Sequence, residues 1–171
     1  MNTIQISPSS KSVLGVFILS LVAFNAHASC SGETRALVEK LLYSGFSGGN
    51  MEVIEQVFSP DIRFEDPMFP PGLEGIKALV KKNNDAMSNW QFAIEDMFCD
   101  ENKAAVRWTA NGIHTGSFMH EEPTGSPVEL KGIVIYEIQG QKIMRDWLMS
   151  DNLGFLTQIG ILSHEKVDMT R

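Results

Sequence analysis

Basic side chains are scarce in this sequence. Lys and Arg together number 14 against 21 Asp and Glu, which gives a formal net charge of −7 at pH 7. A nucleic-acid-binding surface needs clustered Lys and Arg to neutralise phosphates. No run of like charges here exceeds three residues. We therefore expect no nucleic-acid partner. With 43% hydrophobic and 20% charged residues, the composition is that of an ordinary globular domain.

The sequence also lacks the spacings that mark common cofactor and metal sites. The glycine-rich segment 45–49 is not followed by the lysine of a phosphate-binding loop. No His-x-x-x-His or Cys-x-x-Cys pair is present, and two cysteines alone do not complete a zinc site. We therefore expect neither a metal nor a cofactor.

The first 28 residues differ in character from the rest of the chain. They contain no acidic residue, and Lys11 precedes a run of twelve residues, 13–24, of which ten are apolar. This run is too short to span a bilayer, and Ala26-His27-Ala28 forms an A-x-A cleavage site. The pattern predicts a signal peptide over 1–28 and a single domain over 29–171, exported to the periplasm or secreted. An uncleaved anchor or an organelle-targeting peptide is the alternative.

Cys30 and Cys99 are the only cysteines. In an exported protein such a pair can oxidise to a disulfide bond, which here would attach the start of the mature chain to the domain. One exposed thiol and one buried Cys99 are the alternative, and a lipid-modified Cys30 is a third. After cleavage we expect no stable membrane insertion.

Apolar periodicity predicts helices in the first half of the mature chain. The patterns indicate one helix over 33–43, a second that begins after a cap at Asn50, and a third over 74–88. Alternation over 62–66 predicts a short strand between the second and third helices.

The second half is typical of strands joined by tight turns. We expect strands from Trp90 to about residue 98, over 104–115, over 128–138 and over 143–151, with a closing helix over 152–161. Consecutive strands with short turns form an antiparallel meander, and helices then pack on one face, which is an α+β fold. A curved sheet wrapped on helices leaves a concave pocket.

Asp151 is the leading catalytic candidate. Strict alternation places Ile143, Trp147, Met149 and Asp151 on one face of the last strand, so Asp151 would face an apolar interior. Desolvation there would raise its pKa towards neutrality, which suits an acid/base catalyst. Alternatively, Asp151 caps the following helix.

Two other residues, His114 and Asp66, complete the predicted site with Trp147 and Met149. His114 shares parity with Trp108, and on a concave face it would polarise a substrate carbonyl or orient Asp151. Alternatively, His114 holds a neighbouring strand by a hydrogen bond. Asp66 precedes Pro67 at the expected pocket mouth, where it either binds substrate or caps the turn. Trp147 and Met149 are expected to contact the substrate.

Several short motifs occur together in the carboxyl half. They are Gly112-Ile113-His114-Thr115-Gly116, Pro123-Thr124-Gly125, Gly140-Gln141-Lys142-Ile143, Trp147, Asp151 and Gln158-Ile159-Gly160. Over residues 33–162 the chain resembles the SnoaL-like polyketide cyclase (ester cyclase) family of the nuclear-transport-factor-2-like superfamily. The resemblance implies a cone made of one curved sheet closed by helices, with a deep pocket. It also implies pairing of two copies through the outer sheet face.

The resemblance further implies a chemistry. Cyclases of this family perform an intramolecular aldol condensation without metal or cofactor, with an aspartate on the last strand that matches Asp151. Two functions follow as expectations. One is an exported cyclase or isomerase acting on a small apolar carbonyl compound by aspartate acid/base catalysis. The other is a binding module that holds a small hydrophobic ligand without converting it.

Overall fold

A curved sheet with helices packed on it makes up residues 30–64 and 66–162, the part of the chain that the computed structural model describes. The α+β class predicted from the sequence is confirmed. The signal peptide expected over 1–28 lies outside the described residues. No helix among the described residues is long and apolar enough to span a bilayer.

The helical half follows the predicted pattern closely. Helix α1 (Gly32–Lys40) continues into a π-helical segment η1 (Leu41–Phe46), so the helix predicted over 33–43 is slightly longer than expected. Helix α2 (Met51–Val57) begins at Asn50, whose side chain accepts a hydrogen bond of 3.2 Å from the Val53 amide, as predicted. Helix α3 (Leu73–Ala86) buries Ile76 and Val80.

Five strands form one sheet in the order β1-β5-β4-β3-β2. Strands β2 (Met87–Asp100), β3 (Lys103–His114), β4 (Pro127–Gln139) and β5 (Lys142–Ser150) form the predicted antiparallel meander. Strand β1 (Phe58–Arg63) begins earlier than the predicted strand over 62–66, and it pairs in parallel with β5. Helix α4 (Asn152–Gln158) follows β5 and ends before the predicted residue 161.

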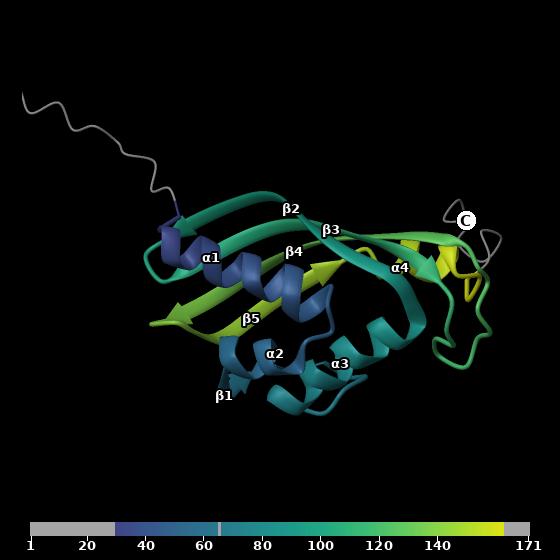
Figure 1. Cartoon of the computed structure of the whole chain (residues 1–171), viewed down its shortest axis with the longest axis horizontal. Helices are drawn as coiled ribbons and strands as arrows, with labels where there is room; N and C mark the ends of the chain where they lie inside the picture. The colour runs from purple at the N-terminus through teal and green to yellow at the C-terminus, as the bar shows by residue number, and fades with distance from the viewer. Residues whose placement is uncertain (1–29, 65, 163–171) are drawn as a thin grey trace, which may run out of the picture.

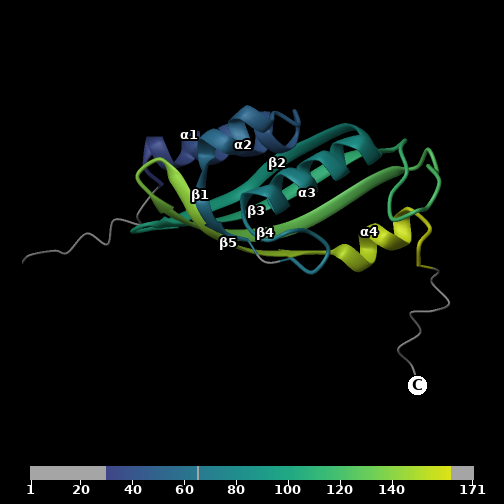
Figure 2. The same cartoon turned by 90° about the horizontal axis from the view of Figure 1, so that it is seen from below.

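The sheet curves around the amino-terminal helices. The register between β2 and β3 shifts between Ser88 and Gln91 and again between Ile94 and Asp96. Irregularities of this kind bend a strand and increase its twist. Figures 1 and 2 show α1, α2 and α3 on the concave side of the sheet, with α4 near one end. This arrangement is the cone that the family resemblance implies.

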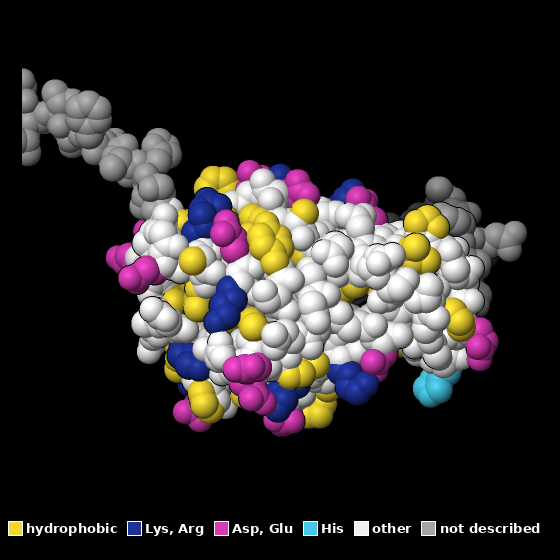
Figure 3. All heavy atoms as spheres, viewed as in Figure 1, with side chains coloured by type: hydrophobic (Ala, Val, Ile, Leu, Met, Phe, Trp, Pro, Cys, Tyr) yellow, Lys and Arg dark blue, Asp and Glu magenta, His cyan; other side chains and the backbone are white. Residues whose placement is uncertain are grey.

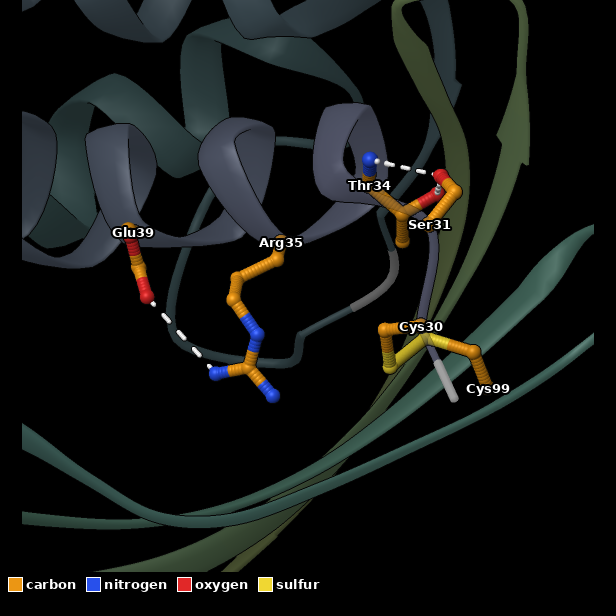
Figure 4. Close-up of a disulfide and its surroundings, with 6 residues drawn as sticks. All are labelled: Cys30, Ser31, Thr34, Arg35, Glu39 and Cys99. Carbon is orange, nitrogen blue, oxygen red and sulfur yellow. Dashed lines mark hydrogen bonds and ion pairs between the residues drawn. A yellow bond between two sulfur atoms is a disulfide. The ribbon is translucent and has the colours of Figure 1, made fainter. Parts of the chain in front are cut away.

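A disulfide bond joins Cys30, just before α1, to Cys99 near the end of β2. The two Cα atoms lie 4.8 Å apart, and 69 positions separate the cysteines in sequence. Figure 4 shows the bond beside the first turn of α1, where the Ser31 hydroxyl accepts a 3.1 Å hydrogen bond from the Thr34 amide. The bond therefore fixes the start of α1 to the far end of the sheet.

Candidate functional site

The concave face of the sheet and the helices above it enclose a cavity of about 380 Å³. Figure 3 shows a hollow in the molecular surface with hydrophobic side chains inside it. Apolar residues dominate the lining, and aromatic side chains are the most frequent among them. Six polar residues also line the cavity: Asp66, Asn83, Tyr136, Asp146, Ser150 and Asn152.

Aromatic rings in contact with one another form one wall of this cavity. The Phe92 ring centroid lies 5.1 Å from that of Trp108, 5.5 Å from that of Phe46 and 5.8 Å from that of Trp90. Tilted and edge-to-face pairs at these separations stabilise each other. The wall thus offers a ligand a preformed apolar surface.

An irregularity in β5 decides which of its side chains enter the cavity. Glu137 of β4 pairs with Arg145, but the next residue of β4, Ile138, pairs with Ile143, so β5 carries one extra residue at this point. Such a bulge interrupts the alternation of side chains along a strand. Ile143 is fully buried, and after the bulge Asp146 and Leu148 line the cavity.

Asp146 is the carboxyl group that this bulge places in the cavity wall. Burial raises its pKa from 3.8 to about 6, partly offset by a hydrogen bond from its own backbone amide. Desolvation favours the neutral form of a carboxyl group, which makes its carboxylate a stronger base. Sequence reasoning missed Asp146 because strict alternation from Ile143 places it on the outer face.

Tyr136 lies directly opposite Asp146 in the antiparallel pair of β4 and β5. Residues opposite each other in such a pair share one face of the sheet, with Cβ atoms about 5 Å apart. Burial, and then the negative charge of Asp146, raise the pKa of the Tyr136 hydroxyl above its usual value. The phenol therefore stays protonated and can donate a hydrogen bond inside the cavity.

Asp151 lies outside the cavity, so the prediction that it faces the apolar interior is wrong. It is exposed, and its Oδ1 accepts a 2.9 Å hydrogen bond from the Gly154 amide at the start of α4. The structure therefore agrees with the alternative interpretation, in which Asp151 caps helix α4. The physical reason is the bulge after Ile143, which reverses the parity on which the prediction rested.

His114 is fully buried but does not line the cavity, so its predicted position beside the substrate is also wrong. The Thr124 amide donates to its Nδ1 over 3.3 Å, and the Thr124 hydroxyl lies 3.2 Å from the same atom. The Gly125 amide donates to the His114 carbonyl. His114 therefore holds the segment between β3 and β4 in place, which is the structural alternative.

The three residues predicted to bind substrate have different positions. Trp147 is 38% exposed on the outer face, where the Arg145 guanidinium lies 4.6 Å from its ring centroid, so its predicted place in the pocket wall is wrong. Met149 is 77% exposed and only borders the cavity. Asp66 does line the cavity, and its Oδ1 also accepts a 2.7 Å hydrogen bond from the Met68 amide. Its part in substrate binding stays a prediction.

The segment Gly45-Phe46-Ser47-Gly48-Gly49 has the Gly-x-Ser-x-Gly spacing of some nucleophilic serines. Its context differs, because Ser47 follows a helix rather than a strand. The Ser47 hydroxyl donates to the Leu42 carbonyl over 3.0 Å and accepts from the Phe92 amide over 2.8 Å. Ser47 therefore joins η1 to β2.

The described residues hold no cluster of three or more His, Cys, Asp or Glu side chains that could bind a metal ion. Within the cavity wall, the Asp146 carboxyl lies opposite Tyr136, and the other polar lining residues are Asp66, Asn83, Ser150 and Asn152.

Solved structures share this architecture. TsrD from Streptomyces laurentii superposes with a TM-score of 0.71 at 22% identity, over 78% of this chain and 99% of TsrD. IdmH, a candidate polyketide cyclase from Streptomyces antibioticus, gives 0.63 at 25% identity, over 74% and 97%. A Catenulispora acidiphila protein with a ketosteroid isomerase-like fold gives 0.59 at 16% identity, over 72% and 92%.

Sequence comparison assigns the family. No curated protein sequence matches the chain. The family model of the SnoaL-like polyketide cyclases matches residues 36–159, which is most of the described domain and agrees with the resemblance found over 33–162. The chain therefore belongs to the SnoaL-like polyketide cyclase family.

Proposed function

We propose that this protein is a cofactor-independent acid/base enzyme, a cyclase or isomerase, that acts on a small, mainly apolar carbonyl compound. Family membership supports the reaction class. The observation that carries the proposal is Asp146, a carboxyl group with a pKa raised to about 6 in a largely apolar cavity. A base whose pKa lies near the working pH is suited to take up a proton and return it.

The pair of Asp146 and Tyr136 supplies the groups that this reaction needs. The Asp146 carboxylate takes a proton from the carbon next to the substrate carbonyl, and the electrons of the broken C–H bond form an enolate. The Tyr136 hydroxyl donates a hydrogen bond to the enolate oxygen. In a cyclase, the enolate carbon bonds to a second carbonyl carbon, and Asp146 returns its proton to the new alkoxide. In an isomerase, the proton returns to a different carbon.

The aromatic wall favours a second function, a binding module for a small hydrophobic ligand. Phe46, Trp90, Phe92 and Trp108 bind an apolar molecule equally well whether or not it reacts. In this case Asp146 and Tyr136 would only orient the ligand by hydrogen bonds.

Deuterium exchange separates the two functions without knowledge of the natural substrate. A panel of apolar ketones is incubated in D₂O with the wild-type protein, Asp146→Asn and the control Asp151→Asn, and exchange next to the carbonyl is followed by NMR. We expect the deuterium exchange rate of Asp146→Asn to be about 10²–10⁴-fold lower than that of the wild-type protein, the usual contribution of a positioned base. The Asp151→Asn rate should stay at the wild-type level. Wild-type binding without any exchange would support the binding module, and full exchange by Asp146→Asn would refute the role of Asp146.

Export is a separate proposal. It is supported by the apolar run and the A-x-A site within 1–28 and by the Cys30–Cys99 disulfide, since such bonds persist in oxidising compartments. Intact-mass measurement of protein from the native host should find that residues 1–28 are absent. A mass that includes them would refute the proposal.

Pairing of two copies is the last part of the proposal. Two cross-strand apolar pairs, Ile133 with Met149 and Ile135 with Trp147, are exposed on the outer face of β4 and β5. A second copy packed there would bury them. Sedimentation equilibrium should show a dimer that Ile133→Lys converts to a monomer, and a monomeric wild-type protein would contradict this.

A further inference from the structure

A lysine side chain lies against two aromatic rings of the cavity wall. The Lys82 ammonium of α3 is 4.7 Å from the centroid of the Phe118 ring and 5.4 Å from that of Phe69. Both rings line the cavity, and so does the next residue of α3, Asn83. Lys82 itself is partly exposed. Lys82 does not itself line the cavity, but its ammonium lies beside two rings that do, within reach of a ligand that extends out of the cavity past them.

Lys82 differs from the other lysines of α3 in its partners. Lys77 pairs with Glu55 over 2.8 Å and with Glu74 over 3.0 Å, and Lys81 pairs with Asp85 over 2.5 Å. For Lys82, by contrast, no carboxylate among residues 30–64 and 66–162 lies within ion-pair distance. The faces of the two rings attract the positive charge of the ammonium. They do not replace an oxygen acceptor for its three N–H groups.

We propose that Lys82 binds a carboxylate or similar anionic oxygen group of the ligand whose apolar part fills the cavity. The inference rests on the proposed function in taking this cavity as the substrate site, and it narrows the substrate class to an amphipathic carbonyl acid. A carboxylate at Lys82 would gain a charge-assisted hydrogen bond while the ammonium keeps its contacts with the rings.

The acidic groups of the cavity define how such a ligand lies. Burial already disfavours the negative charge of the Asp146 carboxylate. A ligand carboxylate beside it would add a second negative charge in the same buried region, which is unfavourable. The Asp66 carboxylate, a second negative group in the cavity wall, accepts a hydrogen bond from the Met68 amide within its own turn. The ligand anion therefore belongs at Lys82, and the reacting carbonyl group points towards Asp146 and Tyr136.

Three probes with the same ten-carbon chain test this charge preference. Decanoate, decan-1-ol and decylamine are titrated by calorimetry at pH 7.5 into the wild-type protein, Lys82→Met and Lys81→Met. Methionine keeps an unbranched side chain on the Phe69 and Phe118 rings but removes the charge. Lys81→Met removes the neighbouring charge of the same helix and serves as the matched control.

We expect the wild-type protein to bind decanoate about two- to fivefold more tightly than decan-1-ol, the size of a partly exposed ion pair. The preference should disappear in Lys82→Met, persist in Lys81→Met and decrease with added salt. Equal binding of acid and alcohol, a preference for decylamine, or binding of none of the three probes would overturn the inference. So would a decanoate preference that survives Lys82→Met. None of the probes is converted, so the result stands even if the exchange assay rejects the role of Asp146.

Discussion

Asp146 on β5 and Tyr136 on β4 are cross-strand partners, and both side chains line the same cavity. The pair places a base and a hydrogen-bond donor side by side on two hydrogen-bonded strands rather than on loops. Burial acts on both groups in the same direction, since it disfavours the charged form of each. The aspartate is thereby a stronger base, and the tyrosine stays a donor.

The buried carboxyl group should reduce stability at neutral pH. The pKa of Asp146 is about 6 in the folded protein against 3.8 as its ordinary value, so the folded state binds more protons between these values. The contribution of Asp146 to stability is therefore complete below about pH 4 and is lost as the pH rises through about 6. Asp146→Asn removes the ionisation. Since one pKa unit corresponds to about 1.4 kcal/mol, we expect its stabilising effect to be about 2–3 kcal/mol larger at pH 7.5 than at pH 4.

Urea unfolding of both proteins at pH 4 and pH 7.5 measures this effect. The advantage of Asp146→Asn over wild type should be larger at pH 7.5, and an advantage of the same size at both pH values would contradict the burial of the carboxylate.

Substitution of Asp151 should affect stability rather than turnover. Its Oδ1 accepts the Gly154 amide at the start of α4, and loss of a helix cap costs about 1 kcal/mol. Asp151→Ala should therefore melt at a lower temperature, whereas Asp151→Asn should melt like wild type because Asn is as good a cap. Both variants should keep the wild-type exchange rate. A large loss of exchange in Asp151→Asn would return the catalytic role to Asp151.

Removal of the Tyr136 hydroxyl should slow the reaction without unfolding the protein. Tyr136→Phe keeps the ring among its buried neighbours but removes the hydroxyl that we propose as the donor to the enolate oxygen. We expect the exchange rate to fall by about 10²–10³-fold, as for other donors to a developing oxyanion. Melting curves serve as the control. Wild-type exchange in Tyr136→Phe would show that the hydroxyl makes no contact with the reacting oxygen.

The Cys30–Cys99 bond should contribute measurably to stability. It closes a long loop, with a sequence separation of 69, and bonds of this kind typically contribute about 2–4 kcal/mol. Cys30→Ser, Cys99→Ser and the double variant should all melt at the same reduced temperature, since each removes the same bond. The melting temperature of the wild-type protein is also measured with and without reductant, and reductant should lower it. An unchanged wild-type melt in reductant would mean that the bond does not stabilise the fold.

Local patterns were sufficient to predict most of the fold. Apolar periodicity located α2, α3 and the four strands of the meander, and Asn50 was recognised as a cap because its side chain acts on an amide only three residues away. The parallel pairing of β1 with β5 was not predicted, because the local sequence of a strand does not indicate which distant strand it pairs with.

The site was harder to predict than the fold because it depends on one extra residue. The bulge after Ile143 moves Asp146 into the cavity and leaves Trp147 on the outer face. One signal was available in the sequence. Ile143 and Leu148 are both apolar but five residues apart, so they share a face only if the alternation breaks between them.

Titration of the Asp146 carboxyl by ¹³C NMR requires no substrate and measures the property on which the proposed acid/base role of Asp146 depends. The Asp146 resonance is assigned by its absence from the spectrum of Asp146→Asn. We expect a pKa of about 6 for Asp146, raised by its burial in the cavity wall. A pKa near 4, the ordinary value of an exposed aspartate, would show that the carboxyl group is solvated and would contradict its assignment as the acid/base group.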